Sequence, residues 1–554
     1  MVYTRPTGEG LSPAEVVILG HLRHWRAASE QEMAEDILSA MAQGDMEFFR
    51  QLDGSFSIIA ICDGSLYLVT DKLATRPLWY AIDRGRVIAS DNIRHVYRNM
   101  AEKPELDAVY LYSFVNYFRT VCDRTPFSTI RAIPAGRLVA IGKDLSIKTS
   151  IYWKPVFQPD RKRSLRDTAA ELSDAVSQSV RRVLSDVARP ALLLSGGLDS
   201  RLVAAHCPKN TTAITLGDSC NAEVRIAQRV AAACGIAHEV LLRHEDWYPQ
   251  MLAKACAASN GISMWDHAHF LPMGEGESFT HDVVALAYGF DILFKGNSFS
   301  ADTERRLARC AHNGLLDFIA TAPPRSRATS AMLRRDRADS AYSAFRATVD
   351  CACEEIAECA EDMLDRYELF WVRNFYTMPA CLNLICLRDF TSERNVTFSN
   401  AMLALYLSIP LSQRNTKGAL IRKAIAHASP KVASIVDANT WLPASWHPYI
   451  HQLSARSRQR IARLRQVYLR WSGSRNAKSR GSWPHVARMW ATNKQMISEM
   501  DALVARPDPR LEEYLDFTYI SQHWADLKAG KPSDTSVESV VATIGLFLRA
   551  CDGK

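Results

Sequence analysis

The sequence predicts an α/β protein with two domains, a β-rich layered domain followed by a doubly wound parallel sheet with helical additions. In residues 1–153, short apolar runs alternate with turn signals such as Asp63-Gly64, which is typical of antiparallel sheets. In residues 166–554, short apolar runs alternate with helical patterns, which is typical of parallel strands with crossover helices. A chain of 554 residues has room for both domains.

Composition and charge indicate a globular protein. Hydrophobic residues make up 47% of the chain and charged residues 23%, and no apolar run approaches the ~18 residues of a membrane span. The thirteen cysteines are odd in number and have no framework spacing, so we expect reduced thiols and a cytoplasmic protein. The formal net charge of +7 suits anionic ligands, and nucleic acid is not expected as a partner.

The β-rich domain is built from strands separated by short turns. We expect its strands within residues 52–62, 64–71, 75–80, 87–91 and 137–141. The domain should end near Tyr152-Trp153. Residues 154–165 contain two prolines and several basic residues, which is typical of a linker.

The second domain begins with a helix and then alternates strands and helices. Apolar residues at helical spacing predict a helix over 165–187, and a second helix over 224–234 should end at Gly235. We expect strands at residues 191–194, 212–217, 237–242 and 282–288. Ligands of such sheets bind at the carboxyl ends of the strands.

The most informative stretch is the turn after the first of these strands, Ser195-Gly196-Gly197-Leu198-Asp199-Ser200. Adjacent glycines allow backbone N–H groups and the start of a helix to approach an anion closely. Two serine hydroxyls add donors, whereas the Asp199 charge fits a phosphate only through a bound Mg²⁺. The turn therefore predicts a site for a magnesium-bound phosphate, formed by Leu194, Ser195, Gly196, Gly197, Asp199 and Ser200, with Leu216 and Gly217 from the next strand. It is not a Walker loop, because no Lys-Ser/Thr pair follows the glycines.

This turn resembles the loop of ATP pyrophosphatases, which holds the pyrophosphate half of ATP, and further segments resemble asparagine synthetases. Residues 286–296, Leu-Ala-Tyr-Gly-Phe-Asp-Ile-Leu-Phe-Lys-Gly, are similar to the second ATP-site segment of that family. The resemblance implies an adenine nucleotide α-hydrolase-like fold, ATP contacts at Ala287 and Gly289, and Asp291 as a second magnesium ligand beside Asp199. It extends through Glu393-x-x-Val-x-Phe and Lys417-Gly, which makes Glu393 and Lys417 candidate catalytic residues.

The first domain resembles the glutaminase domain of the same family through Asp53-Gly-x-Phe, Arg76-Pro-Leu-Trp-Tyr and Tyr152-Trp153. The resemblance implies an Ntn-hydrolase-like fold. Such domains hydrolyse glutamine with a cysteine exposed at the N-terminus, but Val2 stands there and the first cysteine is Cys62, within an expected strand. We therefore expect a degenerate domain without glutaminase activity.

The resemblance implies adenylation of a carboxylate by ATP, release of pyrophosphate and AMP, and amide formation with an amine. The family's acidic residue after the second aspartate is Ile292 here, and its Ser-Gly-Glu is Leu286-Ala287-Tyr288. Free aspartate is therefore not the expected substrate, and a peptide carboxylate is favoured. That carboxylate could belong to a precursor peptide, processed with its protease as in lasso peptide cyclases. The open alternatives are a small carboxylate or a cell-surface sugar polymer amidated with external ammonia, a tRNA-thiolating enzyme, and a non-catalytic ATP-binding relative.

Two further groups are interpreted from the residues alone. Asp266, His267 and His269 are expected to be surface or satisfied core residues rather than ligands. Residues 456–471 carry six arginines and place Ile461, Leu464, Tyr468 and Trp471 along one helical face. The segment is either an amphipathic helix with a solvated basic face or a docking surface for an acidic partner.

Overall fold

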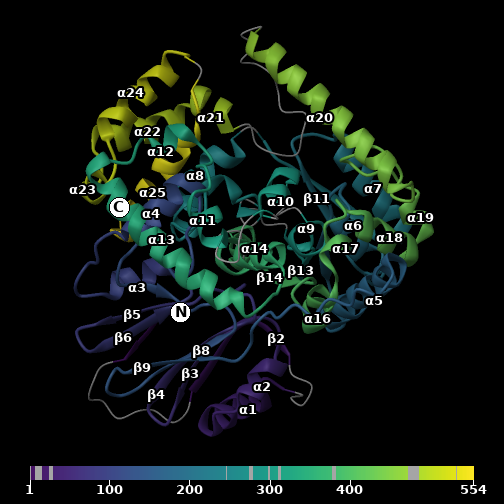
Figure 1. The fold of residues 1–554 in the computed structure, drawn as a ribbon, viewed down its shortest axis with the longest axis horizontal. Coiled ribbons are helices and arrows are strands. Elements are labelled where there is room, and N and C mark those ends of the chain that lie inside the picture. Colours follow the sequence, from purple (N-terminus) through teal and green to yellow (C-terminus); the bar gives the residue numbers. More distant parts are fainter. Residues whose placement is uncertain are drawn as a thin grey trace.

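The computed structural model describes residues 2–5, 15–23, 29–244, 246–271, 273, 279–296, 300–307, 309, 314–376, 382–471, 486–531 and 533–553. Two antiparallel sheets form the lower part of the molecule in Figure 1, and a parallel sheet surrounded by helices forms the rest. Among the described residues, no helix combines the length and the apolar character needed to cross a membrane.

The N-terminal sheets are stacked face to face. The first contains, in order, β1 (Val2–Arg5), β6 (Arg86–Ser90), β5 (Trp79–Asp83) and β7 (Arg131–Ala132). The second contains β2 (Glu15–Arg23), β3 (Asp53–Cys62), β4 (Ser65–Thr70), β8 (Arg137–Ile141) and β9 (Ile147–Ile151). Side chains alternate along β3, so Ile59 and Ile61 pack between the sheets while Ile58 and Ala60 pack on the opposite face.

Helices cover the outer face of each sheet, which gives four layers. The helices over the β2–β9 sheet are α1 (Glu30–Gln43) and α2 (Met46–Gln51), and those beside the other sheet are α3 (Ile93–Asn99) and α4 (Ala108–Tyr117). The predicted hairpin at Asp63-Gly64 joins β3 to β4, and both turn residues have positive φ, at 51° and 78°. The strand expected over 75–80 begins only at Trp79, because the Asp71 carboxylate accepts hydrogen bonds from the backbone of Leu73 and Thr75 and holds a turn there.

The second sheet system is fully parallel, in the order β12 (Ala237–Leu242), β11 (Thr212–Gly217), β10 (Pro190–Leu193), β13 (Val283–Leu286) and β14 (Ser392–Asn395). The strand order reverses at β10, so the carboxyl ends of β10 and β13 form the switch point at which such sheets bind ligands. The strand expected over 282–288 ends at Leu286, because the chain turns through Gly289 at φ 98° into the short helix α9 (Phe290–Leu293).

Helices pack on both faces of the parallel sheet. One face is covered by α5 (Leu165–Leu184), α6 (Asp199–Ala204), α7 (Ala222–Cys234), α16 (Asn400–Ser408) and α18 (Ala419–Ala428). The helix α5 is capped by the Ser164 side chain, and α7 ends at Gly235 in the left-handed region, as predicted. The other face is covered by α8 (Trp247–Ala258), α15 (Leu382–Arg388) and α25 (Ser536–Cys551).

Further helices complete the molecule and extend the upper part of Figure 1. They are α10 (Ala301–Leu307), α11 (Gly314–Ala320), α12 (Arg327–Ser330), α13 (Arg335–Ala357), α14 (Met363–Trp371), α17 (Leu411–Arg414), α19 (Pro430–Ala433), α20 (Pro448–Trp471), α21 (Val486–Thr492), α22 (Lys494–Ala505), α23 (Pro509–Glu512) and α24 (Phe517–Lys528). A 3-10 helix spans Trp265–His267, and a π-helix spans Val372–Tyr376.

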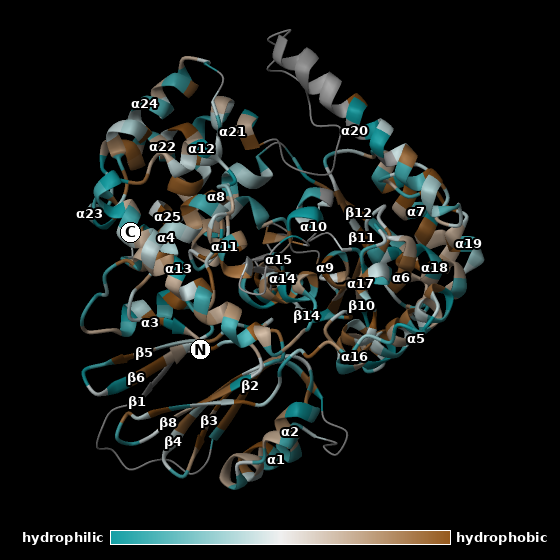
Figure 2. Cartoon of the chain, viewed as in Figure 1, coloured by the Kyte–Doolittle hydropathy of each residue, from teal (hydrophilic) through white to brown (hydrophobic). Residues whose placement is uncertain are grey.

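The two sheet systems share one apolar core. Trp79 and Ile88 from the N-terminal sheet pack in the same cluster as Trp265 beside α8 and as Val540 and Phe547 of α25. The segment expected to be a linker also lies on the second unit, since the backbone N–H of Phe157 donates to the carbonyl of Cys359. Figure 2 shows apolar colouring along the strands of the sheets, with hydrophilic residues on the outer helix faces. The N-terminal unit is therefore anchored through its apolar surface.

Candidate functional site

The turn after β10 is organised by its own hydroxyl groups. The Ser195 backbone N–H donates to Ser200 Oγ at 3.0 Å, and the Gly197 N–H donates to Ser195 Oγ at 3.2 Å. The two hydroxyl oxygens lie 3.2 Å apart. The serines therefore hold the shape of the turn before any ligand binds, and their remaining hydrogen-bonding capacity is available to an anion.

Glycine is required in this turn because another segment touches it. A Cβ on Gly196 would lie 2.9 Å from Ala438 Cβ and 3.0 Å from Glu223 Cγ. The Ala438 backbone N–H also donates to the Gly196 carbonyl at 3.1 Å. The segment that contains Ala438, which precedes α20, therefore contacts the turn after β10 directly.

A buried arginine, Arg201, is hydrogen-bonded to the backbone of the turn after β10. Arg201 is fully buried, and its guanidinium donates to the carbonyls of Gly196, Ile435 and Val436 at 3.2, 2.7 and 2.8 Å. Burial lowers the pKa of Arg201 to about 10, so the side chain is charged at neutral pH. Arg201 is not among the site residues predicted from the sequence, where its only signal is a charged residue between the apolar residues of a helix.

The strand β11, next to β10 in the sheet, contributes further residues to the site. Leu194 N–H donates to the Ile214 carbonyl at 2.9 Å, which holds the turn beside β11. At the end of β11 are Leu216 and Gly217, and a Cβ on Gly217 would lie 2.9 Å from Val224. Because Leu194 directly follows β10 and Gly217 ends the neighbouring parallel strand β11, the predicted ATP-contacting residues lie at the carboxyl ends of adjacent strands.

On the far side of β10, the segment after β13 carries Ala287, Gly289 and Asp291. Gly289 packs against the Phe398 ring, which a Cβ there would approach to 2.7 Å. The Asp291 charge acts on Asp199 and raises its pKa, so the two aspartates are electrostatic neighbours. The two carboxylates that the resemblance pairs therefore lie within electrostatic reach of each other.

Asp199 is held by a lysine that the sequence analysis did not select. The Lys295 ammonium lies 2.5 Å from Asp199 Oδ2. Burial raises the pKa of Asp199, Lys295 lowers it, and the net shift is upward. Lys295 follows Asp291 by four residues, and this closeness in the sequence could have indicated that it belongs to the same site.

Asp199 and Asp291 fit a magnesium ion. The Asp199 Oδ1 atom is buried and has no hydrogen-bond partner among the described residues, so it is available to a cation. The described residues contain no group of three or more acidic, histidine or cysteine side chains able to hold a metal. Two carboxylates with waters and phosphate oxygens are the donors that Mg²⁺ usually takes.

Lys417 lies beside this group. Its ammonium donates to the Gly296 carbonyl at 3.2 Å and to Asn415 Oδ1 at 2.9 Å. A Cβ on the following residue, Gly418, would lie 3.2 Å from Leu198 of the turn. Burial lowers the pKa of Lys417. Gly296 follows Lys295, and Leu198 precedes Asp199. The contacts with these two residues therefore place Lys417 near Asp199 at the carboxyl ends of the strands.

Glu393 occupies a different place, between the two units. Its carboxylate is fully buried in β14 and lies 2.9 Å from the guanidinium groups of both Arg76 and Arg388. Arg388 also donates to the Thr75 carbonyl at 2.9 Å. These contacts connect Glu393 to the N-terminal unit and not to the turn after β10.

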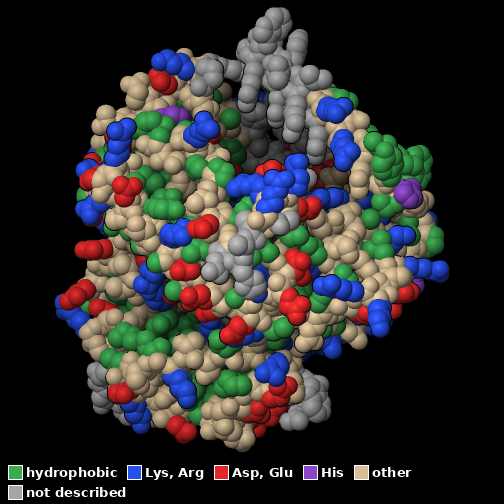
Figure 3. Space-filling model, viewed as in Figure 1, with side chains coloured by type: hydrophobic (Ala, Val, Ile, Leu, Met, Phe, Trp, Pro, Cys, Tyr) green, Lys and Arg blue, Asp and Glu red, His purple; other side chains and the backbone are tan. Residues whose placement is uncertain are grey.

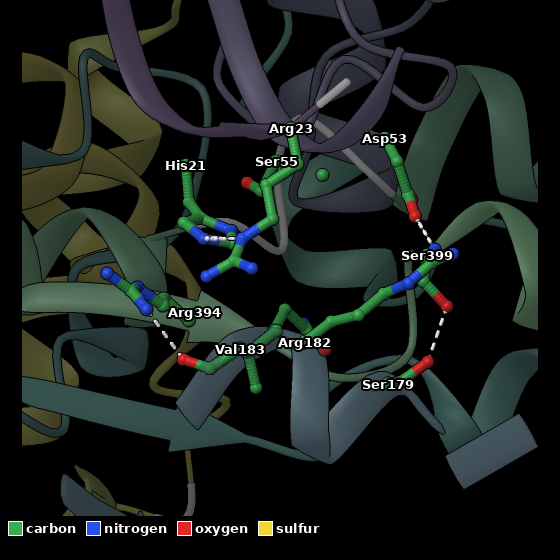
Figure 4. A pocket seen from close by; sticks show the side chains of 11 residues that line it. His21, Arg23, Asp53, Ser55, Ser179, Arg182, Val183, Arg394 and Ser399 are labelled. Carbon is green, nitrogen blue, oxygen red and sulfur yellow. Dashed lines mark hydrogen bonds and ion pairs between the residues drawn. The ribbon is translucent and has the colours of Figure 1, made fainter. Parts of the chain in front are cut away.

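A small cavity lies at the same interface (Figure 4). Side chains from β2, β3, α5 and β14 surround it, among them His21, Arg23, Ser179 and Arg394. Its volume is about 20 Å³, enough for about one water molecule. Burial and the charges of Arg394 and Arg23 lower the pKa of His21 to about 4. None of the residues that line this cavity is a cysteine.

His269 is a buried, hydrogen-bonded residue, whereas Asp266 Oδ1 nearby is buried and has no hydrogen-bond partner among the described residues. His269 is 8% exposed, its Nδ1 lies 2.9 Å from the Tyr248 hydroxyl, and that hydroxyl accepts a hydrogen bond from Arg243 at 2.7 Å. This arrangement agrees with the interpretation of His269 as a satisfied core residue. Every cysteine in the described part of the chain is a free thiol.

Comparisons with known families match both units. A sequence model described as asparagine synthase matches residues 171–508, and one described as glutamine amidotransferase domain matches residues 19–153. A search of the curated proteins finds no match.

Solved structures give weaker similarities. Glutamine phosphoribosylpyrophosphate amidotransferase from B. subtilis, complexed with ADP and GMP, is 10% identical, with 43% of this chain and 47% of that chain covered and a TM-score of 0.18. The allosteric regulatory enzyme of purine biosynthesis is 7% identical, with 42% of this chain and 61% of that chain covered and a TM-score of 0.18. The chain thus spans less than two thirds of either structure.

Proposed function

Because the chain belongs to the asparagine synthase family, we propose that it is an ATP-dependent ligase that adenylates a carboxylate and joins it to an amine. The observation that carries the proposal is the turn after β10. Its hydroxyls and backbone are already arranged, and Asp199 and Asp291 lie together at the switch point of the sheet. This arrangement suits the pyrophosphate of ATP, with magnesium held by the two aspartates.

In this proposal the carboxylate attacks the α-phosphorus of ATP, the bond to the β-phosphate oxygen breaks, and pyrophosphate leaves into the turn. Negative charge grows on the leaving group, so the N–H and hydroxyl groups of Ser195–Ser200 act most strongly in the transition state. Magnesium, when bound, would neutralise part of that charge. An amine then displaces AMP from the acyl group.

We assign different roles to the two lysines, to the buried Arg201 and to Glu393. Lys295 and Lys417 lie at the sheet edge, where their charges can stabilise phosphate oxygens. Arg201 is a positioning residue, since it acts through the carbonyls of the turn and of residues 435–436. We also assign a positioning role to Glu393, because its Oε1 atom pairs with both Arg76 and Arg388 at the interface.

The proposed nitrogen donor is an external or intramolecular amine. Cys62 is the first cysteine of the sequence, and burial raises the pKa of its thiol, which disfavours the thiolate. An amine on the same peptide would react with the benefit of proximity and close a ring, as in lasso peptide cyclases. The odd number of cysteines and the free thiols among the described ones support a reducing, cytoplasmic location.

The test is ATP–pyrophosphate exchange by the purified full-length protein with panels of peptides and small carboxylates, with Mg²⁺ present. The proposal expects exchange with at least one carboxylate, amide formation and AMP when an amine is added, and no glutamate from glutamine. ATP binding without exchange under every condition would favour the non-catalytic alternative. Release of glutamate would overturn the degenerate assignment of the N-terminal unit.

A further inference from the structure

Positive charge is concentrated in one part of this chain. From residue 438 to residue 498 there is no aspartate or glutamate, whereas eleven residues are lysine or arginine. Since the whole chain has a formal net charge of +7, the rest of it is net negative. The helix α20 lies at the centre of this basic stretch. A long stretch with only positively charged side chains raises the local concentration of negatively charged partners.

The same stretch exposes apolar side chains, which together we call the α20 surface. Its members are Trp441 (53% exposed), Trp446 (48%), Tyr449 (61%), Ile450 (42%), Leu453 (45%) and Ile461 (64%). Spacing by three and eleven residues places Ile450, Leu453 and Ile461 on one stripe of the helix. Arg456 and Arg460, both exposed, lie on the same helix. Single exposed apolar residues are ordinary, whereas a cluster of this kind indicates a binding surface.

The side of α20 next to this stripe is fixed to the body of the protein. His451 is 2% exposed, and the Ser454 hydroxyl donates to the Thr440 carbonyl at 2.6 Å. Arg458 donates to the carbonyls of Ala438 and Asn439 at 3.2 and 2.9 Å. These contacts anchor α20 beside the apolar stripe, and Ile450, Leu453 and Ile461 remain exposed next to them.

The α20 surface is continuous with the ATP site. Ala438, which Arg458 contacts, donates to the Gly196 carbonyl of the turn after β10. The Arg458 guanidinium also lies over the exposed Trp441 ring, 5.2 Å from its centre. In Figure 3, lysine and arginine side chains lie at the lower edge of the hollow beside α20, together with acidic side chains. A molecule bound along α20 thus lies at the edge of the site where a carboxylate would be activated.

We propose that the α20 surface docks an acidic, amphipathic peptide, and that this peptide carries the carboxylate to be activated. Arginines pair with its acidic side chains, and the aliphatic and aromatic residues receive its apolar ones. Nucleic acid would leave Ile450, Leu453 and Ile461 without apolar partners. A second copy of this chain would place two basic stretches together, which is unfavourable. The identity of the peptide as substrate rests on the proposed function.

The experiment measures binding by fluorescence anisotropy with the full-length protein in the absence of ATP. The probe is a short labelled peptide that alternates Glu or Asp with Leu or Phe. One control probe has Gln and Asn in place of the acids, and another is a single-stranded RNA of equal length. We expect the acidic peptide to bind most tightly and to lose affinity as salt rises.

Two variants and their matched controls locate the binding. Ile450→Ser/Leu453→Ser/Ile461→Ser and Arg456→Glu/Arg460→Glu should each weaken binding about tenfold or more. The apolar control, Ile147→Ser/Ile151→Ser/Val156→Ser, changes residues that are 48%, 40% and 41% exposed and lie outside this surface. The charge control is Lys143→Glu/Lys148→Glu, both exposed in the N-terminal unit. Neither control should change the affinity.

Three results would overturn the proposal: no binding of the acidic peptide, tighter binding of the RNA, or a dimer in sedimentation that the apolar triple variant dissociates. Peptide binding without pyrophosphate exchange would keep the docking surface and remove its connection to catalysis. Exchange with a small carboxylate and no peptide binding would keep the proposed function and remove the docking surface.

Discussion

At the scale of single residues, Asp199 is subject to opposing influences. Burial raises its pKa, and the charge of Asp291 adds to that effect, while Lys295 lowers it. Without a ligand, the lysine neutralises the aspartate. A cation bound between Asp199 and Asp291 would compete for the same carboxylate and release the ammonium toward the phosphates. The two side chains thus form a neutral pair in the free protein, and Lys295 would become available to the phosphates once a cation binds Asp199.

The first prediction concerns this carboxylate. Asp199→Asn should lower pyrophosphate release about a hundredfold or more, because one of the two proposed magnesium ligands is lost while the amide fills the same volume. The unfolding temperature should fall, because Lys295 is left without its carboxylate partner, and stabilisation of the fold by ATP should no longer depend on Mg²⁺. The matched control is Asp302→Asn, whose side chain is 67% exposed. Unchanged turnover in Asp199→Asn would contradict the assignment.

The second prediction concerns the close contact at Gly196. Gly196→Ala should destabilise the protein by about 1–3 kcal/mol and impair pyrophosphate release, because the new methyl group meets Ala438 Cβ at 2.9 Å. The double variant Gly196→Ala/Ala438→Gly removes the Ala438 methyl group that the new side chain would meet. It should recover part of both losses, which chemical unfolding and the exchange assay measure together. Equal losses in the single and double variants would mean that another contact dominates.

At the scale of elements, pairs of buried charges join segments that are far apart in the sequence. The carboxylate of Glu393 in β14 faces Arg76 from the N-terminal unit and Arg388 from α15. His523 in α24 similarly lies 3.0 Å from Glu538, which is fully buried in α25. Such pairs specify which elements meet, and their loss is costly because an unpaired charge would remain buried.

The third prediction separates a positioning role for Glu393 from a catalytic one. Glu393→Gln should destabilise the protein by about 3–5 kcal/mol, because it leaves two arginines without their carboxylate. At a temperature where the variant is folded, pyrophosphate exchange per folded molecule should be retained. Full stability with abolished exchange would instead support the catalytic role implied by the family resemblance.

The fourth prediction concerns pH. The hydrogen bond to Glu538 and its charge raise the pKa of His523 above the ordinary value of 6.5. The protonated ring therefore stabilises the contact between α24 and α25 fully below about pH 6.5, and that contribution is lost as the pH rises through the raised pKa. Urea unfolding should show a loss on the order of 1 kcal/mol over this window. The loss should vanish in His523→Gln and persist in His447→Gln, which changes an exposed histidine.

Elements that depend on neighbouring residues could be predicted from the sequence, whereas contacts between distant segments could not. The parallel strands, the cap at Gly235 and the turn after β10 depend on apolar runs and glycines that are neighbours in the sequence. The pairing of Lys295 with Asp199, and of Arg201 with residues 435–436, depends on where distant segments fold. The resemblance suggested a catalytic Glu393 but could not indicate that Arg76 would reach it across the interface.

At the scale of the whole molecule, the two units are joined by a common apolar core. Tyr97 and Phe127 of the N-terminal unit stack at 4.6 Å, and Phe127 lies 6.1 Å from the Phe547 ring of α25. The Tyr97 hydroxyl also donates to Asp552 at 2.8 Å. Neither unit therefore buries its apolar surface alone.

The fifth prediction follows from this core. Removal of residues 1–160 should give an insoluble or inactive protein even at saturating ATP, because the exposed apolar area costs about 25 cal/mol per Å². Soluble yield and pyrophosphate exchange measure the result. Co-expression of residues 1–160 as a separate chain is the control, and it should restore part of the soluble protein. A soluble truncated protein with the full-length exchange rate would show that the N-terminal unit is dispensable.

The shared core also has a consequence for synthesis on the ribosome. Trp79 emerges early, but its partners in α25 are translated several hundred residues later. At roughly 5–20 residues per second, the apolar face beside Trp79 waits roughly half a minute or longer for those partners. During that interval the nascent chain displays a hydrophobic surface that its own early residues cannot cover. Chaperone binding should therefore persist until translation reaches the last helix, and ribosome stalling before α25 should leave the N-terminal unit sensitive to protease.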